Sequence, residues 1–128
     1  MTDISEIKLF KNLKELYLNY NKLTDILFVK YLIKLEYLNI GFNKIKDISV
    51  LKYLTELKEL AIYNNDLRDI SVIQYLNLEI LDIENLELES DQIQYIKNLN
   101  NLKRLWCING FNDISVINQL NKNINIII

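Results

Sequence analysis

The 128-residue chain contains no histidine, no proline, two glycines and one cysteine. Without histidine, a Ser-His or Cys-His nucleophile pair and histidine ligation of a metal are excluded. The single cysteine, Cys107, cannot form an intramolecular disulfide, which favours a reducing compartment. Because only Gly41 and Gly110 could loosen the chain, there is no flexible linker, and we predict a single domain spanning residues 1–128.

Signals for membranes, secretion and nucleic acids are missing as well. Half of the residues are hydrophobic, but every apolar run is far shorter than the ~20 residues of a membrane span. The N-terminal segment MTDISEIKLF lacks the basic and apolar regions of a secretory signal. Fifteen basic residues are balanced by seventeen acidic ones, giving a net charge of −2. We therefore expect a cytoplasmic protein that binds neither nucleic acid nor a membrane.

The chain is rich in Ile, Asn, Lys and Tyr, residues with A/T-rich codons. This composition indicates an A/T-rich genome. If that genome is viral, the expected location is the cytoplasm of the host cell.

Three segments align at a spacing of 22 residues: NYNKLTDI (19–26), GFNKIKDI (41–48) and YNNDLRDI (63–70). An Asp-Ile pair at residues 3–4 continues the same step. After each Ile, apolar residues recur at every third position and then at every second position. A three-residue period predicts a helical or 3₁₀ segment, and a two-residue period predicts a strand. A single such coil cannot bury its apolar edge, so the sequence predicts stacked coils with a parallel sheet along one side.

This pattern, L-x-x-L-x-L-x-x-N-x-I/L-x-D-I, resembles that of leucine-rich repeat proteins, and the 22-residue unit is similar to the SDS22-like subclass. The resemblance runs from about residue 2 to residue 128. It implies an α/β repeat fold, a right-handed horseshoe of about five repeats with a short parallel concave sheet and a helical or 3₁₀ convex side. It also implies a non-enzymatic protein that binds another protein without a cofactor. The subclass includes intracellular scaffolds and secreted bacterial internalins, and the missing signal and cysteines disfavour the latter.

The resemblance assigns the most regular residues to the scaffold. In the family, the Asn of the motif forms a ladder in which its amide bonds the backbone of adjacent coils; here these residues are Asn21, Asn43 and Asn65. The Asp of the motif comes where the return helix begins, so its carboxylate is expected to cap free backbone N–H groups; these residues are Asp25, Asp47 and Asp69. The opening motif is therefore predicted to be structural.

The second half of the chain departs from the pattern. The fourth coil is one residue short, and Leu86 stands where an Asn is expected. The fifth unit is longer and predicts a fuller helix that begins at Ser90 or Asp91. Relaxed drift of one repeat and a binding feature both remain possible explanations.

The two ends of the chain also differ from a full repeat. Residues 1–12 are predicted to form an N-terminal half-repeat that acts as a cap. Residues 124–128 are predicted to form an uncapped terminal strand, with Ile124, Ile126 and Ile128 in the strand row. An uncapped coil exposes core and an unpaired strand edge. Pairing with a second copy to form a homodimer, cover by a partner, and tolerance of a short edge remain open.

Candidate binding residues are those that point outward from the concave sheet or stand at its strand ends: Glu15, Tyr17, Tyr37, Asn39, Glu59, Tyr63, Asp82, Glu84, Arg104 and Trp106. This surface is aromatic and acidic. Tyr and Trp are favoured interface anchors, and the carboxylates suit a partner that carries Lys or Arg. An A/T-rich genome also raises the Tyr content everywhere, so a surface of incidental tyrosines is the competing interpretation.

No group of residues supports catalysis. Cys107 falls in a core strand position, and the chain has no Gly-rich phosphate loop. We predict no catalytic residue, no metal and no cofactor. The leading hypothesis is binding of a protein of unknown identity through the concave face, and the alternative is self-association through the terminal strand.

Overall fold

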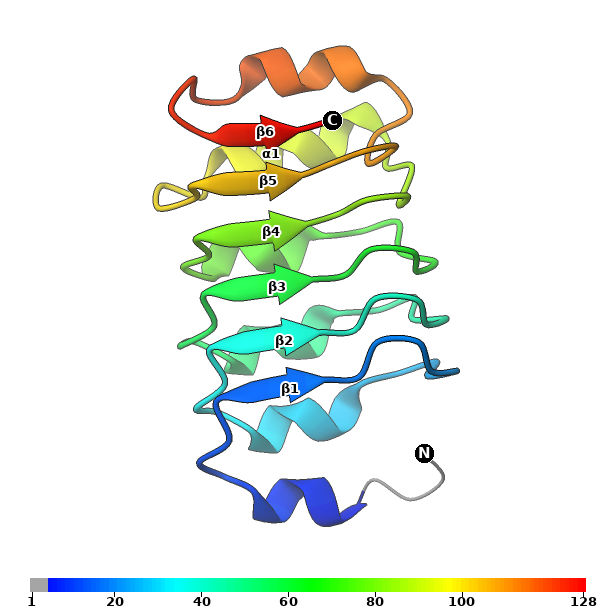
Figure 1. The fold of residues 1–128 in the computed structure, drawn as a ribbon, viewed down its shortest axis with the longest axis vertical. Coiled ribbons are helices and arrows are strands. Elements are labelled where there is room, and N and C mark those ends of the chain that lie inside the picture. The colour runs from blue at the N-terminus through cyan, green and yellow to red at the C-terminus, as the bar shows by residue number, and fades with distance from the viewer. Residues whose placement is uncertain (1–4) are drawn as a thin grey trace.

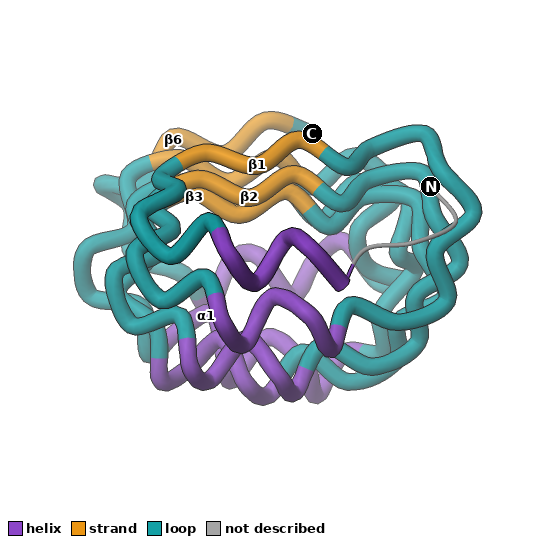
Figure 2. Tube along the Cα trace, turned by 90° about the horizontal axis from the view of Figure 1, so that it is seen from below, coloured by secondary structure: helices purple, strands orange, loops and turns teal. Residues whose placement is uncertain are grey.

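The structure, a computed structural model, describes residues 5–128 as one stack of coils. Each coil places a strand on one side and a short helix on the other (Figure 1). Seen along the stack, the strands form one layer and the helices the opposite layer (Figure 2). The first Asp-Ile pair and the start of the predicted cap lie outside the described residues.

The strands are three residues long. They are β1 (Glu15–Tyr17), β2 (Tyr37–Asn39), β3 (Glu59–Ala61), β4 (Ile80–Asp82), β5 (Arg104–Trp106) and β6 (Asn125–Ile127). The return segments are the 3₁₀ helices η1 (Ser5–Leu9), η2 (Leu27–Tyr31), η3 (Ser49–Tyr53), η4 (Ser71–Tyr75), η5 (Ser90–Gln92) and η6 (Ile114–Gln119), and the α-helix α1 (Ile93–Lys97). The fuller helix expected in the fifth unit is thus present as η5 and α1.

The six strands form one parallel sheet in the order β1-β2-β3-β4-β5-β6. The central Leu residues of the first strands stay in register, with Leu16 beside Leu38 and Leu38 beside Leu60. The register continues through the short fourth coil, where Leu60 pairs with Leu81, and through the long fifth unit, where Leu81 pairs with Leu105. The irregular lengths are therefore absorbed outside the strands, and the sheet stays continuous.

The three-residue apolar period becomes 3₁₀ structure for a direct reason. In the first return segment, Val29 N–H donates to the Ile26 carbonyl and Leu32 N–H to the Val29 carbonyl, at 3.0 and 2.9 Å. The residues joined by these bonds are the buried ones: Ile26, Val29 and Leu32 are at most 1% exposed. A 3₁₀ helix has three residues per turn, so a side chain at every third position faces the core.

The predicted asparagine ladder forms at Asn43 and Asn65 but not at Asn21, which is exposed and donates only to carbonyls of its own coil. The amide of Asn43 donates to the Leu18 carbonyl of the preceding coil at 3.0 Å and accepts from Leu23 N–H at 3.0 Å. Asn65 repeats the arrangement one coil further on, since it donates to the Ile40 carbonyl and accepts from Ile45 N–H. The ladder stops there, because a buried Leu86 occupies the next position.

The predicted aspartate caps are also present. The carboxylates of Asp25, Asp47 and Asp69 accept from the first backbone N–H of η2, η3 and η4, at 3.2, 2.7 and 2.7 Å. The hydrogen bond from Ser49 N–H lowers the pKa of Asp47. The opening motif is therefore structural in the described coils.

The end of the sheet differs from the prediction in one respect. The terminal strand covers only Asn125–Ile127 rather than residues 124–128. Ile124 and Ile126 are partly buried and pack against the core, whereas Ile128 lies beyond the strand and is 66% exposed. Ile124, Ile126 and Ile128 therefore do not form one row on the strand. Of the three, only Ile126 belongs to β6, and its side chain faces inward. Within residues 5–128, no helix is long and apolar enough to cross a membrane.

Candidate functional site

The structure places the ten predicted binding residues on one side of the sheet, at the strands or just past their ends. Along each strand the central residue is inward, and the residues on either side of it are outward; in β2, Leu38 is buried between the half-exposed Tyr37 and Asn39. Register brings the outward residues into columns, so that Asn39 lies beside Ala61 and Ala61 beside Asp82. Tyr63 and Glu84 follow their strands and are also half-exposed. The ten residues therefore share the outward face of the sheet.

Aromatic rings cover the first three coils of this face. The rings of Tyr17 and Tyr37 lie 4.7 Å apart between centroids, tilted by 35°. Just beyond the strand ends, Tyr20 stacks on Phe42 at 4.5 Å and 11°, and Phe42 meets the edge of Tyr63 at 5.6 Å. These five residues are called the aromatic surface below. Tyr20 and Tyr17 remain 68% and 59% exposed, so this contact among rings leaves much apolar area open to solvent.

Gly41 and Asn39 hold two of these rings in place. A side chain at Gly41 would put its Cβ only 2.2 Å from the ring of Tyr63, so that ring lies directly over the glycine. The Asn39 Oδ1 accepts from Gly41 N–H at 3.0 Å, and the Asn39 side chain lies near both Tyr37 and Tyr63, where it partly offsets the effect of burial on their pKa. Burial raises the pKa of both tyrosine hydroxyls.

Acidic residues occupy the next coil. Asp82 accepts from Glu84 N–H at 3.0 Å, and burial, with a smaller contribution from the Glu84 carboxylate, raises the pKa of Asp82 to about 6. Trp106 lies beside Asp82 on the adjacent strand. A carboxyl group with this pKa changes its charge in the weakly acidic range, which an ordinary surface aspartate does not.

Two adjoining hollows run along the face. The first is lined by Leu13, Lys14, Glu15, Tyr17, Glu36, Tyr37, Lys58 and Glu59. The second, of about 210 Å³, is lined by Tyr37, Glu59, Leu60, Ala61, Ile80, Asp82, Arg104 and Trp106. They share Tyr37 and Glu59, so most of the predicted residues border one continuous shallow depression.

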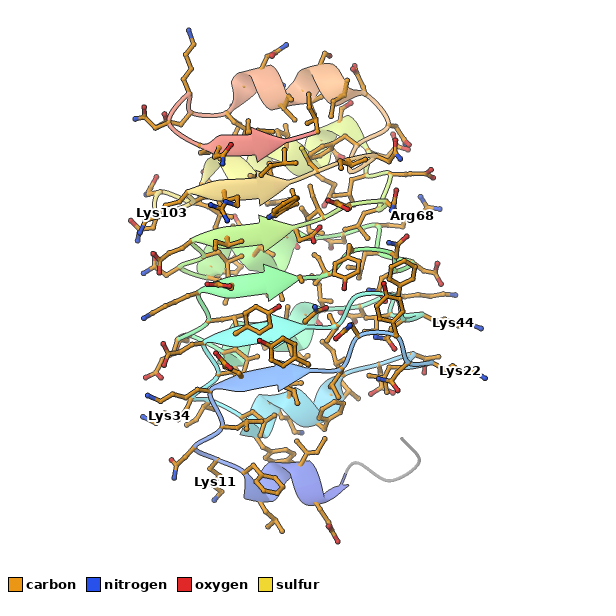
Figure 3. All side chains as sticks on the ribbon, in the orientation of Figure 1. Lys11, Lys22, Lys34, Lys44, Arg68 and Lys103 are labelled. Carbon is orange, nitrogen blue, oxygen red and sulfur yellow. The ribbon has the colours of Figure 1, made fainter. Side chains whose placement is uncertain are left out.

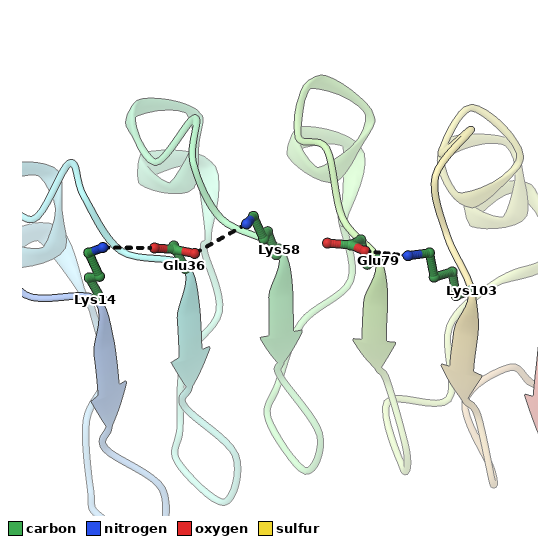
Figure 4. Close-up of polar contacts among 5 residues, drawn as sticks. All are labelled: Lys14, Glu36, Lys58, Glu79 and Lys103. Atoms are coloured by element: carbon green, nitrogen blue, oxygen red, sulfur yellow. Dashed lines mark hydrogen bonds and ion pairs between the residues drawn. The ribbon is translucent and has the colours of Figure 1, made fainter.

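A column of residues of alternating charge at the start of the strands was not predicted from the sequence. Lys14, Glu36, Lys58, Glu79 and Lys103 each immediately precede a strand (Figure 4). Glu36 contacts both lysine neighbours, at 3.6 Å to Lys14 and 3.2 Å to Lys58, and Glu79 lies 2.7 Å from Lys103. Hydrogen bonding to Lys58 is the main cause that lowers the pKa of Glu36. The change of sign from one repeat to the next was the available signal.

Cations, Lys103 among them, also project from the rims of the molecule. Lys22, Lys44 and Arg68 extend from the rim at which the strands end, and Lys11, Lys34 and Lys103 from the opposite rim (Figure 3). On the convex side, Lys52 lies 5.2 Å from the centre of the Tyr53 ring, which is 49% exposed. Tyr31, Tyr53 and Tyr75 are the last residues of η2, η3 and η4, so they form a convex row that is separate from the tyrosines of the concave face.

Residues 5–128 contain few groups that could act as nucleophiles or metal ligands. Cys107 is fully buried, and burial raises the pKa of its thiol to about 11. A thiol with this pKa is protonated at neutral pH and is a weak nucleophile. Among residues 5–128, no group of His, Cys, Asp or Glu side chains is arranged to hold a metal ion.

One buried amide was also missed. Gln92 is 8% exposed, and its Oε1 accepts from Ile70 N–H of the preceding coil at 2.8 Å. It bridges coils as the ladder asparagines do. Its sequence context, with Gln94 two residues later, gives no means of telling which glutamine turns inward.

Comparison with known proteins supports the same architecture. A family profile described as Leucine Rich repeats (2 copies) matches residues 11–53. An internalin (inlF) from Listeria monocytogenes is similar over 98% of this chain and 37% of its own, with 33% identity and a TM-score of 0.87. Internalin C2 (inlC2) from the same bacterium is similar over 83% of this chain and 46% of its own, with 29% identity and a TM-score of 0.71. No curated protein sequence is significantly similar to the chain.

The chain thus spans less than half the length of these two solved structures. Both are internalins, so the similarity gives no support to the expectation that disfavoured this group. Their similarity extends through the stacked coils, the parallel six-stranded sheet and the short helical returns. Together with the repeat profile, it shows that the chain has the leucine-rich repeat fold.

Proposed function

We propose that the chain is a non-enzymatic module that binds a partner protein through its concave face. The observation that carries this proposal is the aromatic surface, where Tyr17, Tyr20 and Phe42 remain 59%, 68% and 42% exposed although the core beneath them is complete without their rings. Exposed apolar patches edged by polar groups are typical of protein-binding sites. Tyrosine supplies a large contact area with few rotatable bonds.

Three further features support a binding role over catalysis. The concave depression is shallow and continuous, whereas small-molecule sites are enclosed. The buried thiol of Cys107 is protonated at neutral pH. Leucine-rich repeat proteins are in general protein-binding modules, and the 22-residue spacing with its Asp-Ile pairs favours the SDS22-like subclass.

The proposal is tested by affinity capture with the full chain from a lysate of its source organism or host. The site variant Tyr17→Ala/Tyr37→Ala removes two aromatic rings from the concave face. The control variant Tyr53→Ala/Tyr75→Ala removes two aromatic rings from the convex face. We expect proteins that are retained by the wild type and the control to be lost from the site variant, with all three chains showing the same circular dichroism spectrum. Equal retention by the site variant would exclude the concave face.

A second candidate function is self-association at the end of the stack. Within residues 5–128, β6 pairs with β5 alone, and Ile128 beyond it is 66% exposed. A parallel strand edge with apolar neighbours can pair with another chain. Sedimentation of the wild type and of Ile128→Lys tests this candidate, which requires a dimer that the lysine weakens. A wild-type monomer at about 0.5 mM, well above the range of ordinary dimer affinities, would rule it out.

A further inference from the structure

Two residues of the aromatic surface have a backbone conformation that bulky side chains rarely adopt. Tyr20 and Phe42 have positive φ angles of 61° and 52°. The same position in the next coils is filled by Asn64, Asn85 and Asn109, with φ angles of 52°, 57° and 52°. Asn tolerates the left-handed region, whereas bulky side chains are strained there.

Hydrogen bonds show that these positions are equivalent. Tyr20 N–H donates to the Gly41 carbonyl and Phe42 N–H to the Tyr63 carbonyl, at 2.9 and 3.0 Å. In the same way, Asn64 N–H donates to the Glu84 backbone carbonyl of the next coil at 3.0 Å. The coil geometry therefore requires the left-handed turn everywhere, but it does not require a ring. Strain that persists without a structural need points to a functional role for the two rings.

The strained rings are continuous with the rest of the aromatic surface. Tyr20 stacks on Phe42 and Phe42 contacts Tyr63, while the Asn39 side chain lies near both Tyr63 and Tyr37. Tyr37 in turn contacts Tyr17. Five rings from three coils thus share one surface. Neighbouring strands lie about 4.8 Å apart, so three coils span roughly three residues of an extended segment.

The charges beside these rings are unbalanced. In the hollow next to Tyr17 and Tyr37, the ammonium groups of Lys14 and Lys58 both contact Glu36. Glu15 and Glu59 line the same hollow, and within the described residues neither takes part in an ion pair. Three carboxylates against two ammonium groups leave one net negative charge. The free carboxylates and the ring faces both favour a cation.

We infer that the aromatic surface binds an arginine side chain carried by an extended segment of the partner protein. The inference rests on the proposed function and specifies its partner. A guanidinium is planar, so it stacks on a tyrosine ring while its N–H groups bond a carboxylate such as Glu15 or Glu59. A lysine ammonium satisfies the charge but cannot stack, and a neutral apolar side chain leaves both carboxylates without a partner.

The test selects binders from a display library of random 12-residue peptides on the full chain. We expect arginine to be enriched among the selected peptides. Replacing that arginine by leucine should weaken binding about tenfold, and lysine should restore part of the loss.

The decisive variant is Tyr20→Asn/Phe42→Asn, because it installs the residue that the fold already uses at three equivalent positions. Relief of strain offsets the lost ring contacts, so Tm should stay within about 5 °C of the wild-type value. The arginine peptides should bind this variant about tenfold more weakly, because the rest of the extended segment, beyond the arginine at the hollow, loses its contact with these two rings. The convex variant Tyr53→Asn/Tyr75→Asn is the matched control and should bind them as the wild type does.

Each result distinguishes this inference from the proposed function. Peptides that lack arginine, yet lose binding to Tyr17→Ala/Tyr37→Ala, would overturn the inference and support the concave face as a protein-binding site. Arginine peptides that bind Tyr20→Asn/Phe42→Asn as tightly as the wild type would also overturn it. Failure to enrich any peptide that depends on the concave rings would count against both.

Discussion

The asparagine ladder gives the sharpest prediction about stability. The change is Asn65→Ala, which removes one amide and leaves the backbone around it intact. Within residues 5–128, Ile45 N–H has the Oδ1 of Asn65 as its acceptor, at 3.0 Å. The Nδ2 of Asn65 donates to the carbonyls of Ile40, Ile62 and Tyr63. Asn65 is 9% exposed, so water has little access to the groups that would lose their partners.

The magnitude follows from counting which groups are left without a partner. The Ile40 carbonyl keeps the amide of Asn43, and the Tyr63 carbonyl keeps the N–H of Phe42. Ile45 N–H and the Ile62 carbonyl lose their contacts with the amide. A buried backbone group that lacks a partner costs about 1–3 kcal/mol, so two of them lower the free energy of unfolding by about 3 kcal/mol. That is a large share of the stability of an ordinary domain.

The matched control is Asn21→Ala. Asn21 is exposed and donates only within its own coil, to the carbonyls of Leu18 and Asn19. The Leu18 carbonyl keeps the amide of Asn43, and water can reach the site, so the expected loss is below about 1 kcal/mol. Urea unfolding followed by circular dichroism measures both changes. If the two variants lose the same free energy of unfolding, the buried bridge between coils contributes nothing beyond an exposed hydrogen bond, and the reasoning is wrong.

Three other predictions concern the concave face and its edge. Asp82→Asn should raise the free energy of unfolding at pH 7 by about 1 kcal/mol, after allowance for solvent screening at this half-buried position. Because the pKa of Asp82 is raised to about 6 in the folded state, its ionisation lowers the free energy of unfolding increasingly as the pH rises from about 4 to 6. Urea unfolding at pH 3.5 should therefore show no difference between the variant and the wild type. Gly41→Ala should displace the ring of Tyr63, since the new Cβ would lie 2.2 Å from it. The tyrosine NMR signals of the concave face should change and Tm should fall. Unchanged signals would contradict the contact. Glu36→Gln should cause a small loss of Tm at low salt that disappears at 1 M NaCl, because its two lysine neighbours lie on the surface; a loss that persists in high salt would show that the ion pairs are not its cause.

The sequence by itself determined the repeat and much of its chemistry. Its 22-residue period placed Leu16, Leu38 and Leu60 in one inward column, because a strand has a period of two and a stacked coil repeats its register. The family resemblance carried by this period implied the asparagine ladder, which is present at Asn43 and Asn65 but not at Asn21. These features depend on local spacing, which can be read along one chain.

Only the tertiary structure decided how different coils act on one another. The strain at Tyr20 and Phe42 became visible when their φ angles were set beside those of the equivalent asparagines. The inward turn of Gln92, the pairing of Glu36 with two lysines and the raised pKa of Asp82 also depend on neighbours about one coil away. Burial, charge pairing and ring contact arise between segments far apart in sequence, so the period fixes where a side chain stands, and the packed coils fix what it meets.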